Sequence, residues 1–226
     1  MQKQELVDAV EAQWLQWQES AAENGVTADF PEGFVERHRR VLEASDYVAQ
    51  CCQRDPRLLV SLVESGDLES SFGDDEITAQ LAKELEMISD EALLHKTLRL
   101  FRRRQMVRII WRDLTQTASL AETLEDLSAL ADACIQGALD LLYEWAVVKQ
   151  GVPRDAEGNQ QYLVVLGMGK LGARELNLSS DIDLIYTYPS AGEVDGPRYL
   201  SNEQFFTRLC QQLTKAINTQ TVDGFV

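Results

Sequence analysis

The spacing of the apolar residues changes near residue 150, and this change constrains the fold more than any other feature of the chain. Before that point apolar residues recur at intervals of three and four, as on one face of an α-helix. The pattern is clear in Leu6, Val10, Trp14 and Trp17. A short polar stretch with glycine and proline follows, and after it come apolar runs typical of strands at 162–166 and 182–188. We therefore predict the α+β class, with a helical bundle at 1–150 and a mixed sheet with helices at 151–226.

Several helix boundaries can also be predicted. Residues 90–117 form one long amphipathic pattern. Ser119 with Glu122, and Ser201 with Gln204, have the spacing of a capping box, in which the first side chain binds a free backbone N–H of the helix start. We expect a helix to begin at each of these pairs.

The charge of the chain excludes one broad class of function. The net charge is −16, and acidic residues are in excess everywhere except at 99–112, where six arginines occur without an acid. Such a surface repels polyanions, which argues against a general DNA or RNA binder. The simpler interpretation of the arginine run is a solvated basic face that pairs with the acidic helices around it. The alternative is a docking face for an acidic partner or a phosphate-bearing ligand.

Other residue types give weaker signals. No apolar run approaches the roughly 18 residues of a membrane span, and the start of the chain does not resemble a signal peptide, so we expect a cytoplasmic protein. His38 and His95 lie in helical patterns and are expected to be packing or surface residues. Four cysteines without metal-ligand spacing are expected to be buried free thiols: Cys51, Cys52, Cys134 and Cys210.

A glycine-rich turn follows the first predicted strand. Glycines at 167, 169 and 172 allow the backbone to pass close to a phosphate group and to point N–H groups at it, and a helix starting near Leu171 would add its positive end. Lys170 is a candidate phosphate contact. The spacing fits neither a dinucleotide-binding fingerprint nor a P-loop. Gly167, Gly169, Lys170 and Gly172 are therefore candidate phosphate-binding residues, and the glycines shape the turn in either case.

Two aspartates stand at the start of the second predicted strand. Because side chains alternate along a strand, Asp181 and Asp183 lie on one face, with Ile182 turned toward the core. Two carboxylates on one side suit Mg²⁺, which also keeps waters and binds substrate phosphate oxygens. This pair indicates metal-dependent nucleotidyl or phosphoryl transfer. Ser179 and Ser180 either bind substrate phosphate or cap the turn.

The run GMGKLGARELNLSSDIDLIY at 167–186 resembles the signature of the glutamine synthetase adenylyltransferase family, a branch of the DNA polymerase β-like nucleotidyltransferases. The similarity extends to LRLFRRRQMVRIIWRDL at 98–114, to NEQFFTRLCQQL at 202–213 and to the terminal DGFV. It implies a nucleotidyltransferase fold for 151–226. It also implies that Asp181 and Asp183 are catalytic ligands of Mg²⁺.

Members of this family carry two similar catalytic domains, an adenylyl removase followed by an adenylyltransferase. The leading helical region and the sequence of the glycine turn resemble the first of these domains, the adenylyl removase. The resemblance therefore implies removal of AMP from a tyrosine of glutamine synthetase, with inorganic phosphate attacking the AMP phosphorus and ADP released. It implies uridylylated PII signal protein as an activator and a role in nitrogen regulation.

The chain departs from the family pattern in two ways. The family usually has Gly-Gly where this chain has Gly172-Ala173, and Phe where it has Leu178. In addition, a third carboxylate of the family follows the DGFV segment, on a strand that would begin near Gly224. We expect the sequence to be truncated before that residue, so that the catalytic site is incomplete.

Three alternatives remain at this point. The first is an interaction module that binds PII or nucleotide without catalysis. The second is the reverse reaction, adenylyl transfer from ATP to glutamine synthetase, because both family domains use the same carboxylates. The third is a nucleotidyltransferase acting on RNA or an antibiotic, which the acidic surface disfavours.

Overall fold

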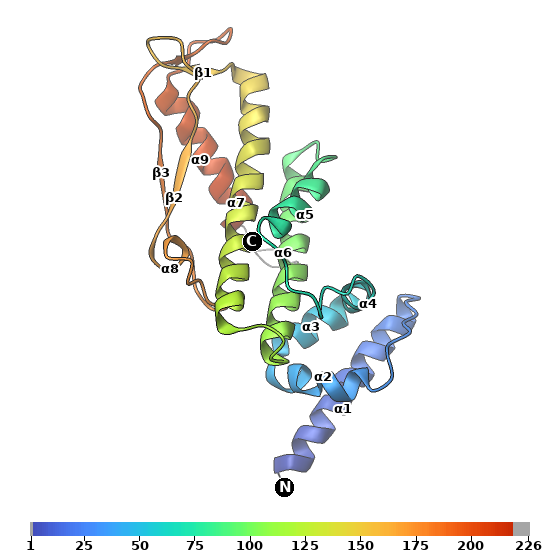
Figure 1. Ribbon diagram of the computed structural model, residues 1–226. Coiled ribbons are helices and arrows are strands. Elements are labelled where there is room, and N and C mark those ends of the chain that lie inside the picture. Colours follow the sequence, from blue (N-terminus) through green and yellow to red (C-terminus); the bar gives the residue numbers. More distant parts are fainter. Residues whose placement is uncertain (1, 219–226) are drawn as a thin grey trace. The chain divides into compact units, whose positions relative to one another are not determined.

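The computed structural model describes the backbone of residues 2–218 and the side chains of residues 10–218 (Figure 1). By its internal contacts the chain divides into two compact units. Unit 1 comprises 1–73 and 103–123, and unit 2 comprises 74–102 and 124–226. The predicted strand near Gly224 lies outside the described residues.

The regular elements among the described residues of unit 1 are all helices. It contains α1 (Gln2–Glu23), α2 (Phe34–Ala44), α3 (Asp46–Arg54), α4 (Pro56–Glu64) and the second half of α6 (Glu91–Leu114). Local signals set these boundaries: the Ser45 side chain accepts from the Val48 N–H at the start of α3, and Pro56 occupies the first turn of α4. The long helix predicted over 90–117 is confirmed as α6.

An aromatic cluster forms the centre of unit 1. Trp17, Phe30 and Phe34 follow one another with ring centroids 5.2 and 4.8 Å apart, and Phe34 lies 5.7 Å from Trp111 on α6. His38 packs in the same cluster, where its Nδ1 accepts a hydrogen bond of 2.9 Å from the Trp111 indole N–H. His38 is thus a buried packing residue, as expected.

The arginines of α6 correct the expectation of a solvated basic face. Arg108 is fully buried and Arg112 nearly so. Spaced four residues apart, Arg104, Arg108 and Arg112 share one helix face and hold the segment 65–72. Arg104 pairs with the Asp67 carboxylate at 2.6 Å. Arg108 donates to the carbonyl oxygens of Asp67 and Ser70, at 3.1 and 2.8 Å.

Two further contacts complete this arginine face. Arg112 donates to the Leu68 carbonyl at 3.2 Å and pairs with Glu122 at 2.7 Å. The Arg108 guanidinium also lies over the Phe72 ring. The pairing with acidic residues was predicted correctly, but the solvation was not, because backbone carbonyls of an irregular segment need buried donors and arginine supplies several in a fixed fork.

Unit 2 contains the strands. Its helices are α5 (Glu76–Leu85), the first half of α6, most of α7 (Leu120–Gln150), α8 (Gly169–Gly172) and α9 (Asn202–Asn218). Two antiparallel pairs are described: β1 (Pro153–Arg154) with β4 (Glu193–Val194), and β2 (Val164–Gly167) with β3 (Leu184–Thr187). The α+β class is confirmed, and the described strands pair only in antiparallel fashion.

Both predicted capping boxes begin helices. The Ser201 and Gln204 pair is reciprocal, since each side chain accepts from the backbone N–H of the other. The Ser119 hydroxyl accepts from the Glu122 N–H, whereas the Glu122 carboxylate binds Arg112 instead of returning to Ser119. The cap therefore also connects α7 to the arginine face of α6, within unit 1.

The predicted strands at 162–166 and 182–188 correspond to β2 and β3. The β2–β3 hairpin packs beside α9 and α7 in unit 2 (Figure 1). The short pair β1 and β4 was not predicted, because two residues on each side give no apolar periodicity. The division at residue 150 stays a prediction, since the compact units group 74–102 and 124–150 with the strands.

The remaining expectations concern single residues. Cys51, Cys52 and Cys134 are buried free thiols, as predicted, and Cys210 is half-buried. Burial raises the pKa of the Cys134 thiol to about 12. His95 is buried, and burial lowers its pKa. Over residues 2–218, no helix is long and apolar enough to cross a membrane.

Candidate nucleotidyltransferase site

The glycine turn between β2 and α8 depends on its glycines in different ways. A Cβ on Gly172 would lie 2.4 Å from the Gly167 carbonyl oxygen, and one on Gly167 would lie 3.0 Å from Leu171. Gly169 has φ +56, and a Cβ there would meet nothing within 4 Å. Gly172 is thus required by close approach to the backbone, Gly167 fits tightly against the Leu171 side chain, and Gly169 combines a left-handed backbone with open space.

The helix that follows the turn is shorter than predicted. It begins at Gly169, two residues before the expected start, and ends at Gly172. One turn aligns few peptide dipoles, so its contribution to a phosphate site is small. Backbone N–H groups of the turn are partly used internally: the Gly172 N–H donates to the Met168 carbonyl, and the Ala173 N–H donates to that of Gly169.

The hairpin register brings the aspartates to this turn. Gly167 pairs with Leu184, and one step further the Met168 N–H donates to the Asp183 carbonyl at 2.9 Å. Asp181 and Asp183 are exposed, while Ile182 and Leu184 are half-buried. The predicted alternation is confirmed, although the strand itself begins only after Asp183.

Apolar side chains make up most of the rest of the face that carries the carboxylates. Cross-strand neighbours share a face of a hairpin, so Leu166 and Ile185 lie on the same side as Asp183. Their side chains are 47% and 48% exposed, and Met168 is 44% exposed. The two aspartates therefore stand on an open, largely apolar surface.

Ser179, Ser180 and Lys170 form one hydrogen-bonded group beside the aspartates. The Lys170 ammonium donates to the Ser180 hydroxyl at 3.1 Å, and that hydroxyl donates to Asn177 Oδ1 at 2.7 Å. The same Asn177 oxygen accepts from the Ser179 N–H at 3.3 Å. Sequence reasoning missed Asn177, although an Asn two residues before a serine pair is a signal for an Asx turn.

Arg174 was also missed. It directly follows the turn and has φ +56, an uncommon conformation for a residue with a side chain. Its guanidinium binds both oxygens of Glu125 and one oxygen of Asp132, both on α7. The Glu125 interaction raises the pKa of Arg174, and the hydrogen bond from Arg174 lowers that of Glu125.

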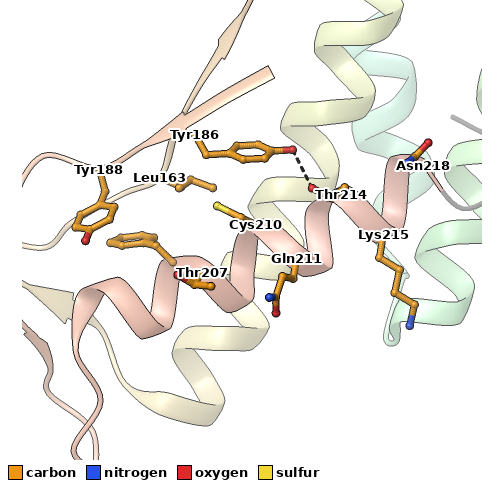
Figure 2. Close-up of a pocket in the computed structure, with 10 residues that line it drawn as sticks. Leu163, Tyr186, Tyr188, Thr207, Cys210, Gln211, Thr214, Lys215 and Asn218 are labelled. Carbon is orange, nitrogen blue, oxygen red and sulfur yellow. Dashed lines mark hydrogen bonds between the residues drawn. The ribbon is translucent and has the colours of Figure 1, made fainter. Parts of the chain in front are cut away.

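Two cavities adjoin the hairpin on its other face. One of about 290 Å³ lies against the glycine turn and α7, lined by Gly167, Leu171, Asp132 and other residues. The other, of about 610 Å³, lies between β3 and α9, where Tyr186, Tyr188 and Thr214 line it (Figure 2). Of the predicted site residues, only Gly167 contributes to either lining.

The donor set fits a hydrated magnesium ion. Mg²⁺ keeps several waters and takes one or two carboxylates, with substrate phosphate oxygens completing its shell. Two exposed carboxylates separated by one residue satisfy that requirement. Among the described residues, three or more acidic, histidine or cysteine side chains do not gather into a metal cluster.

Comparison with known proteins finds matches over most of the chain, the site residues included. The family model for glutamate-ammonia ligase adenylyltransferase matches 35–226. A protein of Pseudomonas aeruginosa is 53% identical over 87% of this chain, and one of Thioalkalivibrio sulfidiphilus is 45% identical over 93%. A third, from Pseudomonas putida, is 49% identical over 83%. All three are named bifunctional glutamine synthetase adenylyltransferase/adenylyl-removing enzyme.

These alignments cover 20%, 21% and 19% of the respective relatives, so the chain spans about a fifth of their length. The family match includes the glycine turn, both aspartates and the arginine face of α6. The chain belongs to the glutamate-ammonia ligase adenylyltransferase family.

Proposed function

We propose that this chain carries the nucleotide-handling site of an adenylyl-removing enzyme, which takes AMP from a tyrosine of glutamine synthetase by phosphorolysis. One observation carries the proposal: the hairpin register sets Asp183, and with it Asp181, directly beside the glycine turn. A carboxylate pair next to a turn able to approach phosphate is what nucleotidyl transfer requires. The names of the relatives support the substrate.

Asp181 and Asp183 would hold Mg²⁺, which when bound neutralises phosphate charge and orients the leaving oxygen. Lys170 would present its ammonium group to a phosphate oxygen, and its hydrogen bond to the Ser180 hydroxyl holds it beside the segment that carries the aspartates. An oxygen of inorganic phosphate attacks the AMP phosphorus, the bond to the tyrosine oxygen breaks, and that oxygen takes up a proton. The products are ADP and unmodified tyrosine.

The exposure of the site favours a protein substrate. The carboxylates stand on an open face beside exposed Leu166 and Ile185, outside both described cavities of the hairpin. A site on an open apolar surface suits a group presented by another protein, because such surfaces are typical of protein interfaces. We propose glutamine synthetase as that protein, uridylylated PII as the activator and the cytoplasm as the location.

The test is an assay of ADP release by the full-length enzyme that carries this sequence, with adenylylated glutamine synthetase, phosphate, Mg²⁺ and uridylylated PII. ADP should appear only when phosphate is present. Asp181→Asn should abolish the reaction and leave the melting temperature unchanged, because Asp181 is exposed. Glu193→Gln, an exposed acid on β4, is the matched control. Full activity of Asp181→Asn would refute the proposal.

The reverse reaction is the second candidate, because adenylyl transfer from ATP would use the same carboxylates. The same assay separates the two directions. Incorporation of AMP from ATP into unmodified glutamine synthetase, with no ADP release from the adenylylated form, would assign this site to the transferase reaction instead.

A further inference from the structure

The segment between the glycine turn and the aspartates is fastened to α7, and the fastening centres on Arg174. We infer that Arg174 is a positioning residue: through Glu125 and Asp132 it fixes the segment that carries Asp181 and Asp183. The inference rests on the proposed function, since it assigns a role in the metal site of that reaction.

The Arg174 guanidinium binds two carboxylates of α7. The Arg174 Nε donates to Glu125 Oε2 at 2.8 Å, Nη2 donates to Glu125 Oε1, and Nη1 donates to Asp132 Oδ2 at 2.9 Å. Glu125, Ser128 and Asp132 are spaced three and four residues apart, so they share one helix face. A two-pronged contact to one carboxylate and a third bond to another leave the guanidinium a single orientation.

Further contacts continue along the chain from Arg174 to Asp181. Two residues after Arg174, the Leu176 side chain is buried and its N–H donates to the Ser128 hydroxyl at 3.4 Å, on the same face of α7. Asn177 then accepts from the Ser179 N–H and the Ser180 hydroxyl. Ser180 directly precedes Asp181. An unbroken set of contacts thus leads from α7 to the first carboxylate.

The backbone conformation of Arg174 is energetically unfavourable. Arg174 adopts φ +56, which a residue with a Cβ adopts rarely and which surrounding contacts must maintain. The three bonds to α7 supply such contacts. The ion pairs are about half exposed, and exposed pairs add little to global stability. Their effect should therefore be local order of the segment rather than the stability of the unit.

The experiment removes the negative charges of the two carboxylates on α7, and with them the two-pronged ion pair to Glu125, and leaves the segment itself intact. In the full-length enzyme that carries this sequence, Glu125→Gln with Asp132→Asn should make backbone amides at 174–183 exchange with deuterium about tenfold faster. The matched control is Asp140→Asn with Glu144→Gln, the same two chemical changes on the same helix, which should leave that exchange unchanged. The melting temperature is recorded for both, and Glu125→Gln alone serves if the double variant unfolds.

A second readout separates positioning from mere structure. Mn²⁺ binding, followed by electron paramagnetic resonance, should weaken about tenfold in the double variant, as is typical when groups that orient a metal ligand are lost. It should be unchanged in the control. Arg174→Lys, which keeps the charge but lacks the planar fork, should retain more affinity than Arg174→Gln.

Each outcome is decisive. Equal exchange in the double variant and the control would overturn the role of Arg174, as would faster exchange with unaltered Mn²⁺ affinity. If Asp181→Asn does not reduce Mn²⁺ binding by the full-length enzyme, the proposed metal site fails. In that case faster exchange in the double variant would show that Arg174 anchors the segment but has no role in the proposed reaction.

Discussion

At the scale of single residues, the glycine turn shows that one motif combines two kinds of requirement. Gly172 is fixed by close approach to the Gly167 carbonyl, whereas Gly169 is fixed by its backbone angle alone. In the sequence both positions are simply glycine. Only the structure separates a glycine that packing requires from one that leaves space for a ligand.

This difference predicts unequal effects of alanine. Gly172→Ala places a methyl group 2.4 Å from a backbone oxygen, so the turn must shift, and we expect a loss of about 2 to 3 kcal/mol of stability. Gly169→Ala meets no atom and should cost only about 1 kcal/mol of backbone strain. Urea unfolding of both variants measures this. Equal losses would contradict the account of the turn.

The sequence alone predicted that exposed Asp181 and Asp183 alternate with a more buried Ile182, because side chains of an extended backbone alternate with a period of two. It did not identify Arg174, Asn177, Glu125 and Asp132. Arg174 and its acceptors are separated by 42 and 49 residues, and no local pattern predicts a pairing over that distance. Asn177 lies within a local turn and was accessible in principle.

At the scale of elements, α6 differs most from expectation. A run of arginines on a helix usually indicates a solvated face, yet here Arg108 and Arg112 donate to backbone carbonyls of 65–72 and Arg104 pairs with the Asp67 carboxylate. The periodicity was informative in retrospect, because residues 104, 108 and 112 are spaced by four and form one row. What the sequence lacked was the partner, an irregular segment whose carbonyl groups have no helical hydrogen bonds.

Arg108→Ala should therefore destabilise unit 1. The change leaves the carbonyls of Asp67 and Ser70 without a buried charged donor, and such losses typically cost about 3 to 5 kcal/mol. Lys96→Ala removes an exposed cation from the same helix and should change stability by less than about 0.5 kcal/mol. Thermal unfolding followed by circular dichroism compares the two. Similar small effects would restore the solvated interpretation.

At the scale of the whole molecule, the chain consists of two compact units, whereas the division at residue 150 stays a prediction from apolar spacing. The change from helical to strand-like spacing near residue 150 is real in the described structure, where strands begin at Pro153. The compact units depend on other contacts, however. Within unit 2, for example, Leu81 and Leu85 of α5 pack against Gly137 of α7. Periodicity reports local structure, and it does not report which helices pack together.

Each unit contains one buried histidine, and this predicts a pH dependence that can be assigned to a unit. Burial lowers the pKa of His38, while Glu69 opposes and Arg37 adds to the lowering. A histidine with a lowered folded pKa takes up its proton more readily in the unfolded state. Its contribution to stability is complete above the unfolded pKa, about 6.5, and is lost as the pH falls below it.

Unit 1 should therefore become less stable as the pH falls below about 6.5, because the unfolded chain binds the proton that folded His38, whose Nδ1 accepts from Trp111, resists. Trp145→Phe leaves three tryptophans, all in unit 1, whose fluorescence reports denaturant unfolding of that unit. In this background His38→Asn should remove the pH dependence. His95→Asn, in unit 2, should not. Unaltered pH dependence in His38→Asn would contradict the assignment.

The central claim is that Asp181 and Asp183 bind the metal used in AMP removal, and a change of metal preference tests it most directly. A thiolate prefers softer metals than a carboxylate does. We predict that Asp183→Cys in the full-length enzyme loses ADP release with Mg²⁺ and regains part of it with Cd²⁺. Asp29→Cys, at an exposed position in unit 1, should behave as the unsubstituted enzyme. Full activity of Asp183→Cys with Mg²⁺, or failure of Cd²⁺ to restore any, would contradict the claim.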